Sequence, residues 1–474
     1  MNIERNIEFF KILDNKELDE LHFSSLELLE RTGINIHHEE AIKLLNQAGA
    51  KVNGKRVKIP SSLVKQALNT VPERVVVSNR TGERKIFLEK GKTYFGTGSD
   101  LKYTIDIYNQ KKKNTVLEDI KNAALLCDYL ENIDFIMSYG LASNVKANTG
   151  ELHQFYAMIQ NNCSKPMIIT SFEMDFEVLK ALYEIACIVA GGETELRNNP
   201  FIVLYGQFIS PFEHNKDGLE RLLFCAEKGI PIIYVPTVMA GASGPATMAG
   251  SLALANAETL TGIVISQLKS KGAPFIFGGC VTPFDMREAV IPYGAPEWSI
   301  NDVVLAQLAR YYNLPVFGTG GCSDSPIVDE QAAIEGTFSV LLGALAGTNL
   351  IHDVGYLERG LTGDLSYLVM MDEVIGMTKR VLQGIEVNNS TLVLDLINKV
   401  GPGGHFTEKK HTYDNFKKET WYPDLIKRKG QDKSMKFRAR EKAKKILENN
   451  EAKPVSNLKN KEIKNIINSI EDKN

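Results

Sequence analysis

Short apolar runs alternate with longer segments of helical periodicity over the central part of the chain. The runs are continuously apolar rather than alternating, as in strands of a parallel sheet that is covered on both faces. They predict strands at 135–139, 167–171, 202–206, 232–235, 275–278, 316–318 and 350–353. Helical segments are predicted between them at 149–161, 174–190, 216–228, 247–270, 297–312 and 328–346.

This alternation of strand and helix predicts an α/β fold. Seven units of this kind fit a TIM (β/α)8 barrel best, with the eighth strand degenerate or supplied by the region near Tyr94 or Thr104. A doubly wound open sheet is the alternative. In a barrel, the residues just beyond the carboxyl ends of the strands form the active site.

The two ends of the chain differ in pattern from its centre. Residues 1–117 predict an N-terminal α/β layer, in which apolar runs at 75–77 and 86–88 flank a turn and indicate a hairpin. Residues 118–425 form the predicted barrel domain. Residues 426–474 are rich in Lys and Glu with weak helical periodicity, which predicts a charged helical tail that is solvated and frayed.

Composition narrows the classes of function. A net charge of -3 argues against nucleic acid as the main partner. The sequence contains no uninterrupted run of about 18 apolar residues, so it predicts no membrane-spanning helix. Charges interrupt the N-terminus where a signal peptide would be apolar. The six scattered cysteines are typical of reduced thiols, and we expect a cytoplasmic protein.

Several polar residues follow predicted strands and are candidates for a site at the barrel mouth. These are Gln207, Thr237, Gly320 and the pair His352–Asp353. A histidine at a strand end can be a hydrogen-bond donor, a base or a ligand, although a buried histidine bonded to a carbonyl is equally consistent. Cys280, Cys322 and His352 also suggest a zinc site, but buried packing of both cysteines is the better interpretation.

Aromatic residues are concentrated near the strand ends, with Tyr94, Phe208 and Tyr356 among them. Such rings can surround a quaternary ammonium group, and each cation–π contact contributes about 0.5–2 kcal/mol. Core packing beneath the loops is the alternative for any single ring.

Longer motifs give the chain a resemblance to a known family. The segments at 28–52, 241–268, 292–298, 307–315, 320–325 and 341–364 carry it. With them the sequence resembles the trimethylamine methyltransferase family, the cobamide-dependent methyltransferases. The resemblance covers the chain to about residue 425. It implies a TIM barrel that transfers a methyl group from a methylated amine to the Co(I) of a separate corrinoid protein.

One departure from the family changes the expected substrate. Founding members carry pyrrolysine, whereas this chain contains only standard residues. A quaternary ammonium already has a neutral leaving group and needs no such electrophile, so the resemblance favours a betaine, such as glycine betaine, carnitine, γ-butyrobetaine or proline betaine. The order Asp-x-His-x-x-Gly of a cobalt-binding motif is absent around 351–355, so the corrinoid is expected on a partner protein. We expect neither a cofactor nor a metal on this chain.

With this chemistry the candidates take roles. His352 is the expected carboxylate anchor and forms the catalytic set with Asp353 and Gln207. Tyr94, Phe208 and Tyr356 are the expected cage rings, and Thr237 and Gly320 complete the substrate-binding set. A homo-oligomer is the default expectation. Two other classes remain open: a zinc-dependent corrinoid methyltransferase for another methyl donor, and a non-catalytic protein that binds quaternary ammonium compounds.

Overall fold

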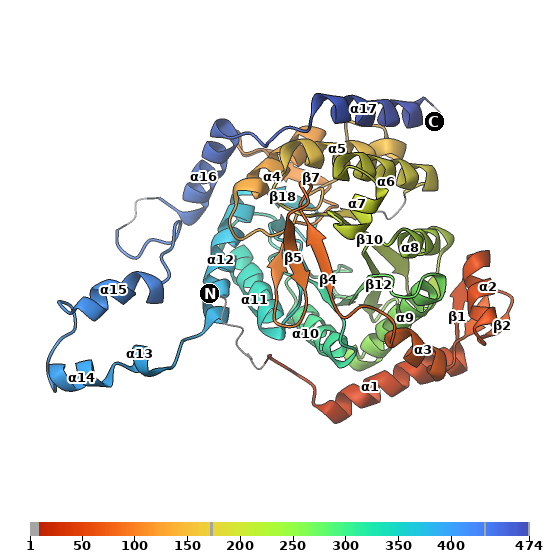
Figure 1. Ribbon diagram of the computed structural model, residues 1–474, viewed down its shortest axis with the longest axis horizontal. Helices are drawn as coiled ribbons and strands as arrows, with labels where there is room; N and C mark the ends of the chain where they lie inside the picture. The colour runs from red at the N-terminus through yellow and green to blue at the C-terminus, as the bar shows by residue number, and fades with distance from the viewer. Residues whose placement is uncertain (1–8, 171–173, 431–432, 473–474) are drawn as a thin grey trace.

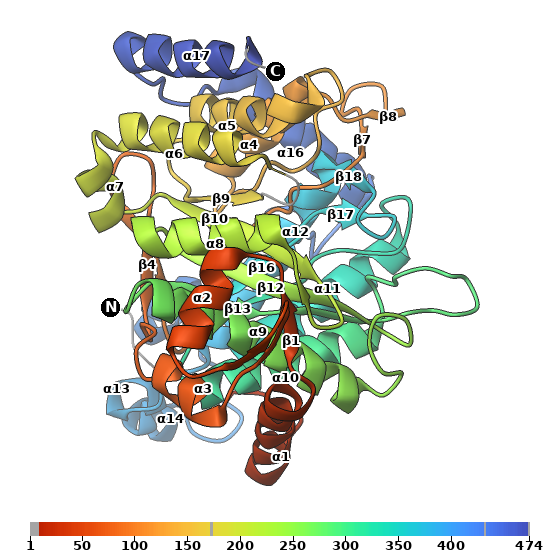
Figure 2. The same cartoon turned by 90° about the vertical axis from the view of Figure 1, so that its right-hand side faces the viewer.

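A curved parallel sheet surrounded by helices forms the centre of the computed structural model, which describes residues 9–170, 174–430 and 433–472 (Figures 1 and 2). Neighbouring strands follow in the order β9, β10, β12, β13, β15, β16 and β6, and every pair is parallel. Their bounds are Met167–Thr170, Ile202–Ile209, Ile232–Ala240, Phe275–Gly278, Val316–Thr319, Leu350–His352 and Tyr94–Phe95. The α/β class and six of the predicted strands are confirmed, although Ser171 lies outside the described residues.

The predicted eighth strand, near Tyr94 or Thr104, and the predicted strand at 135–139 had different outcomes. The region near Tyr94 does supply a strand, because β6 pairs with β16. Instead of a strand, residues 135–139 form isolated parallel bridges, from Phe135 to Gly96 and from Ile136 to Met167. The Thr104 region contributes β7 (Tyr103–Ile105) to a small separate sheet with β8 (Lys112–Asn114), β17 (Tyr356–Leu357) and β18 (Thr362–Asp364).

Six helices lie where the sequence predicted them: α5 (Gly150–Asn161), α6 (Phe176–Ala190), α8 (Lys216–Lys228), α9 (Met248–Lys269), α10 (Pro296–Tyr311) and α11 (Glu330–Ala346). Helix α4 (Leu117–Tyr129) precedes them and α12 (Leu365–Gln383) follows them. Local signals set their ends: the Asn215 side chain accepts a hydrogen bond from Gly218 N, and Gly229, at φ 72°, ends α8. The short α7 (Glu193–Asn198) follows α6.

Helix α9 is long and apolar, and it lies inside the protein. Among the described residues, it alone has the length and composition to cross a membrane. Yet 83% of its most apolar window is buried within the protein, so core packing accounts for its composition.

A hairpin closes the amino-terminal end of the sheet. Strands β4 (Val75–Ser78) and β5 (Arg84–Leu88) are antiparallel, which confirms the predicted hairpin. Ser78 N donates to the carbonyl of Pro200, just before β10 begins. The apolar side chains of the hairpin share a core with inward residues of the sheet such as Val203 and Phe317. The hairpin therefore packs at the amino-terminal ends of the strands, opposite the ends where the candidate site residues lie.

The N-terminal layer is joined to the main sheet. It contains α1 (Asn15–Glu27), a π-helical turn at Leu28–Thr32, β1 (Ile34–Ile36), α2 (Glu39–Gln47), β2 (Lys51–Asn53), β3 (Arg56–Lys58) and α3 (Ser61–Leu68). Strand β1 pairs with β11 (Glu213–His214), which in turn pairs with β10. Because β6 also belongs to the main sheet, strands from both sides of residue 117 share it. The division into domains stays a prediction.

The C-terminal segment packs against the helices. Helix α16 (Met435–Asn449) lies on α12 and α4, and α17 (Asn457–Glu471) lies on α6 and α5. Ile463, Ile467 and Ile470 of α17 are buried. The predicted helical character is confirmed, but a solvated, frayed tail was wrong, because the apolar residues of α17 recur on one face and pack there. Three short helices precede this segment: α13 (Asn389–Leu392), α14 (Leu394–Val400) and α15 (Lys410–Glu419).

Candidate active site

A small cavity of about 120 Å³ lies at the carboxyl ends of the parallel strands. Residues from β10, β12, β15, β16 and β14 (Cys280–Pro283) line it together with two loops. The lining consists of Ser99, Asp100, Tyr205, Gln207, Thr237, Cys280, Thr282, Ile291, Tyr293, Trp298, Thr319, His352 and Asp353. This volume is well below the roughly 300–1,000 Å³ of pockets for drug-sized ligands, so the cavity suits a ligand of few heavy atoms.

His352 and Asp353 form a buried pair at the end of β16. The Nδ1 atom of His352 lies 2.9 Å from the carbonyl oxygen of Gly318, which can only accept, so Nδ1 carries a proton. The Nε2 atom lies 3.4 Å from Oδ1 of Asp353. Burial lowers the pKa of His352 to about 4 and raises the pKa of Asp353 to about 8. At neutral pH both side chains are therefore uncharged, and the Asp353 carboxyl lies beside the unprotonated Nε2.

Asp100 brings a second carboxyl group to the cavity. The side chain is exposed to the cavity space. Desolvation by the surrounding protein and the nearby Asp353 raise its pKa to about 6. Its backbone N–H donates to the hydroxyl of Tyr356, at 3.0 Å, and that hydroxyl donates to the carbonyl of Tyr139. Asp100 is thus largely ionised at pH 7, whereas Asp353 is largely protonated.

Close packing around Gly98 holds the two carboxyl groups. A Cβ atom at Gly98 would lie 2.1 Å from Oδ1 of Asp353 and 2.4 Å from the Tyr356 ring. Only glycine permits this approach.

Strand β10 contributes two polar side chains to the cavity wall. Gln207 Nε2 donates to the hydroxyl of Tyr205 and also lies 3.5 Å from Sγ of Cys280. Burial raises the pKa of Cys280 to about 12, so its thiol stays protonated. The Tyr205 ring lies 5.9 Å from the His352 ring and meets it edge-on. This arrangement fixes the rings and leaves no reactive thiolate.

Two polar groups on the lining residues have no partner within the described part of the chain. They are the hydroxyl of Thr237 and the indole Nε1 of Trp298. Trp298 is 5% exposed, and its ring lies 4.6 Å from the Tyr293 ring. Buried polar groups are almost always hydrogen-bonded. Two such groups without partners beside a cavity therefore indicate a ligand that forms hydrogen bonds with them.

The structure brings together some of the residues that the sequence singled out. Gln207, Thr237, His352 and Asp353 line the one cavity. Gly320 lies beside it and donates its N–H to the His352 carbonyl.

Three predicted cage rings lie elsewhere. Tyr356 packs behind Asp100, where its hydroxyl accepts from Asp100 N and donates to the Tyr139 carbonyl. Phe208 is next to Gln207 on β10, so its side chain points to the other face of the sheet, where it stacks on His214 at 4.2 Å. Tyr94 begins β6 at the end opposite the cavity, and its hydroxyl accepts from Phe87 N. Alternation of side chains along a strand explains the misplacement of Phe208, and the choice of strand end explains that of Tyr94.

Other lining residues were not assigned roles from the sequence. Asp100 follows the glycine-rich run at 96–98, and Tyr293 and Trp298 both lie in the 292–298 motif that supported the family resemblance. Their sequence signal was present, but nothing in it showed that the loops at Asp100 and Tyr293 and the first turn of α10 at Trp298 meet at the strand ends.

The zinc hypothesis finds no support in the geometry. Within the ranges that the structure describes, no three His, Cys, Asp or Glu side chains are placed to hold a metal ion. Cys322 is buried and does not line the cavity with Cys280 and His352.

Comparisons with known proteins show the family to which the chain belongs. Residues 1–473 match the trimethylamine methyltransferase (MTTB) family. The chain is 33% identical to trimethylamine methyltransferase MttB of Desulfitobacterium hafniense, covering 97% of this chain and 93% of that protein. It is 31% identical to a glycine betaine methyltransferase of the same species, covering 89% of this chain and 88% of that one.

A solved structure supports the fold independently. The monomethylamine methyltransferase of Methanosarcina barkeri superposes with a TM-score of 0.51 at 14% identity, over 94% of this chain and 89% of that one. The fold is therefore shared beyond recognisable sequence identity. The chain is a methyltransferase and belongs to the trimethylamine methyltransferase family.

Proposed function

We propose that this protein transfers a methyl group from a small quaternary amine, glycine betaine or a related betaine, to the Co(I) of a corrinoid on a separate partner protein. The observation that carries the proposal is the pairing, in one small cavity, of a carboxylate at Asp100 with the unpaired donors of Thr237 and Trp298. A betaine carries an ammonium group, which the Asp100 carboxylate complements, and a carboxylate, which the two donors complement. The glycine betaine methyltransferase among the relatives also supports this donor.

The chain's own residues would bind and aim the donor. Asp100 and the rings of Tyr205, Tyr293 and Trp298 attract the ammonium group. Thr237 Oγ1 and Trp298 Nε1 donate to the carboxylate. Neither lysine nor arginine is among the described lining residues, so neutral donors supply this anchor.

His352 has a different role in this proposal from the anchor that the sequence suggested. An anchor needs a free N–H, but the proton on Nδ1 already faces Gly318 and Nε2, which carries no proton, lies beside Asp353. We infer that burial keeps Asp353 protonated and that His352 holds it in place. One negative charge rather than two then faces the substrate, which limits stabilisation of the ground-state cation.

The transfer itself needs positioning more than acid–base chemistry. The methyl group leaves its nitrogen with neither electron of the C–N bond, the nitrogen keeps the pair as a neutral tertiary amine, and Co(I) supplies the pair for the new bond. A quaternary nitrogen needs no protonation before it leaves, so the transfer needs no general acid. Orientation of the methyl group toward the opening is the contribution that the protein makes.

The same proposal includes a closed barrel, a cytoplasmic location and a homo-oligomeric assembly. The bridges at Phe135 and Ile136 link β6 to β9, so this segment would serve as the eighth strand. A cytoplasmic location agrees with six free cysteines. A homo-oligomer remains part of the proposal.

Methylation of free cob(I)alamin, followed by its absorbance change, tests the function. The panel contains glycine betaine, carnitine, γ-butyrobetaine, proline betaine, trimethylamine and tetramethylammonium. We expect turnover with a betaine and none with trimethylamine. Turnover with trimethylamine alone would overturn the quaternary donor. Tight binding of a betaine without turnover, also with the corrinoid partner present, would favour the binding-protein alternative.

A further inference from the structure

Residues 385–422 form an arm that leaves the body of the protein and returns to the same helix. The arm begins after α12 ends at Gln383, and it ends where the N–H groups of Leu425 and Ile426 donate to Oε1 of Glu373 on α12. Figure 1 shows it extending away from the rest of the molecule. Not one residue of α13, α14 or α15, all of which the structure describes, is buried. Helices this short are marginal without tertiary packing.

The arm exposes several large apolar and aromatic side chains. Its most exposed large side chains are Ile385, Val387, Leu394, Ile397, Tyr413 and Tyr422. Together they expose about 800 Å², taking roughly 200 Å² for a fully exposed side chain of this size. These side chains are spread along the arm, and their summed area is close to the roughly 800 Å² that each partner contributes to a standard interface.

One backbone conformation in the arm is not explained by contacts within the described part of the chain. Val393, between α13 and α14, has φ 43° and ψ 42°. A β-branched residue rarely adopts this left-handed conformation, and it persists where surrounding contacts impose it. Within the described chain α13 and α14 bury nothing that would do so.

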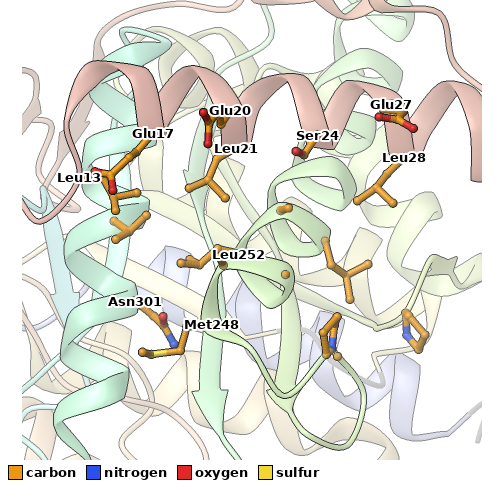
Figure 3. A pocket seen from close by; sticks show the side chains of 18 of the residues that line it. Leu13, Glu17, Glu20, Leu21, Ser24, Glu27, Leu28, Met248, Leu252 and Asn301 are labelled. Carbon is orange, nitrogen blue, oxygen red and sulfur yellow. The ribbon is translucent and has the colours of Figure 1, made fainter.

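A large apolar groove lies elsewhere on the molecule, between α1 and α9. Its volume is about 1000 Å³. In Figure 3 Leu21 of α1 and Leu28 of the π-helical turn after it lie across the groove from Leu252 of α9. Glu17, Glu20 and Glu27 follow one another along α1 at its edge. Arg31 also lines the groove and pairs with Glu27 at 2.7 Å, so three carboxylates and one guanidinium leave this rim with a net negative charge.

Helix α15 matches this groove in shape and charge. Tyr413 and Phe416 are three residues apart, so they lie on one face of the helix, and both are exposed. Lys409 and Lys410 precede them, and Lys417 and Lys418 follow them. An amphipathic helix that lays aromatic anchors into an apolar groove is a common recognition mode. The lysines at both ends complement an acidic rim.

We propose that α15 of one copy of this chain seats in the α1–α9 groove of a second copy. Figure 1 shows α15 far from α1 of the same chain, so the arm cannot fill its own groove while both its ends are held on α12. The second copy is the occupant because each chain offers both complementary surfaces. Two such contacts related by a two-fold axis give a closed dimer, and a repeated contact of the same kind gives a ring.

Charge reversal on the full-length protein tests this pairing. One variant carries Lys417→Glu and Lys418→Glu, and the other carries Glu20→Lys and Glu27→Lys; all four side chains are on the surface. In sedimentation velocity at micromolar concentration we expect the wild type to be a dimer or larger and each variant to be a monomer. An equimolar mixture of the two variants should reassemble, because the acidic arm of one then meets the basic groove of the other.

Apolar variants test the anchors separately. Tyr413, which is 79% exposed, is replaced in Tyr413→Ser, and Ser24→Trp places a ring in the groove. Both should dissociate the assembly, whereas Tyr108→Ser and Ser469→Trp, at exposed positions outside the arm and the groove, should not. Circular dichroism confirms folding of every variant. A monomeric wild type, variants that stay assembled, or a mixture that stays monomeric would each overturn the proposal.

Discussion

Oδ1 of Asp353 lies 3.4 Å from Nε2 of His352, while the other nitrogen of the same ring faces the Gly318 carbonyl. Asp353 adopts this position with a left-handed backbone, at φ 68°. Aspartate tolerates that conformation better than most residues. The chain therefore turns sharply at the end of β16 and presents a protonated carboxyl group to the cavity at neutral pH. This relationship separates the roles of the two cavity acids.

Asp100 supplies the negative charge, so Asp100→Asn is expected to raise the KM for a betaine about 10-fold with a smaller change in kcat. The pKa of Asp100 is about 6, and the ionised form attracts the cation. Wild-type affinity should therefore fall as the pH drops through about 6. Isothermal titration between pH 5 and 8 measures this, and the variant should show a flat profile. A wild-type profile without this decline would contradict the assignment.

Thr237→Val removes a hydroxyl that has no partner within the described chain but should bind the substrate carboxylate. We expect a loss of about 10- to 150-fold in kcat/KM for a betaine, since a hydrogen bond to a charged group contributes about 1.5–3 kcal/mol. Binding of tetramethylammonium, which lacks a carboxylate, should be unchanged and serves as the internal control. Equal losses for both ligands would assign Thr237 a purely structural role.

Gly98→Ala forces a Cβ atom against Asp353 and Tyr356. Displacement of these groups by even 1 Å is expected to reduce kcat/KM by about 100-fold. Gly150→Ala is the matched control, because its new Cβ would approach no atom more closely than 3.7 Å. Steady-state kinetics and a melting curve are measured for both. Full activity of Gly98→Ala would show that the carboxyl positions are not critical.

Asp302 makes stability depend on pH. It lies beneath the cavity, its Oδ2 accepts from Thr319 N, and burial raises its pKa to about 8. Because the folded state holds this proton and the unfolded state does not, the contribution to stability is full below about pH 4 and is lost as the pH rises to about 8. Asp302→Asn cannot ionise.

The variant should gain about 4 kcal/mol in unfolding free energy over the wild type between pH 5 and pH 9, because the wild type loses about 1.4 kcal/mol for each pH unit up to its pKa of about 8. Urea denaturation at both pH values measures the difference. Glu288→Gln, at an exposed position, controls for the loss of one carboxyl group. A constant difference between Asp302→Asn and the wild type across this range would contradict the raised pKa.

Sequence patterns predicted the elements better than their contacts. The buried strands and the helices between them follow from apolar runs and from caps such as Asn215. The polar residues that end β10, β12 and β16 therefore came together as expected at Gln207, Thr237 and His352. Tyr293 and Trp298 could not be placed, because the path of their loop depends on packing far away in sequence. The burial of α17 was missed for the same reason.

The hairpin of β4 and β5 has a consequence for the order of events in the proposed reaction. Since Val77 and Ile86 pack at one end of the sheet, we expect donor and acceptor of the proposed reaction both to approach from the carboxyl ends of the strands. The amine must enter before the corrinoid protein docks, and the demethylated amine can leave only after that protein departs. The kinetics should accordingly follow a compulsory order, with the acceptor as the last partner to arrive and the first to go.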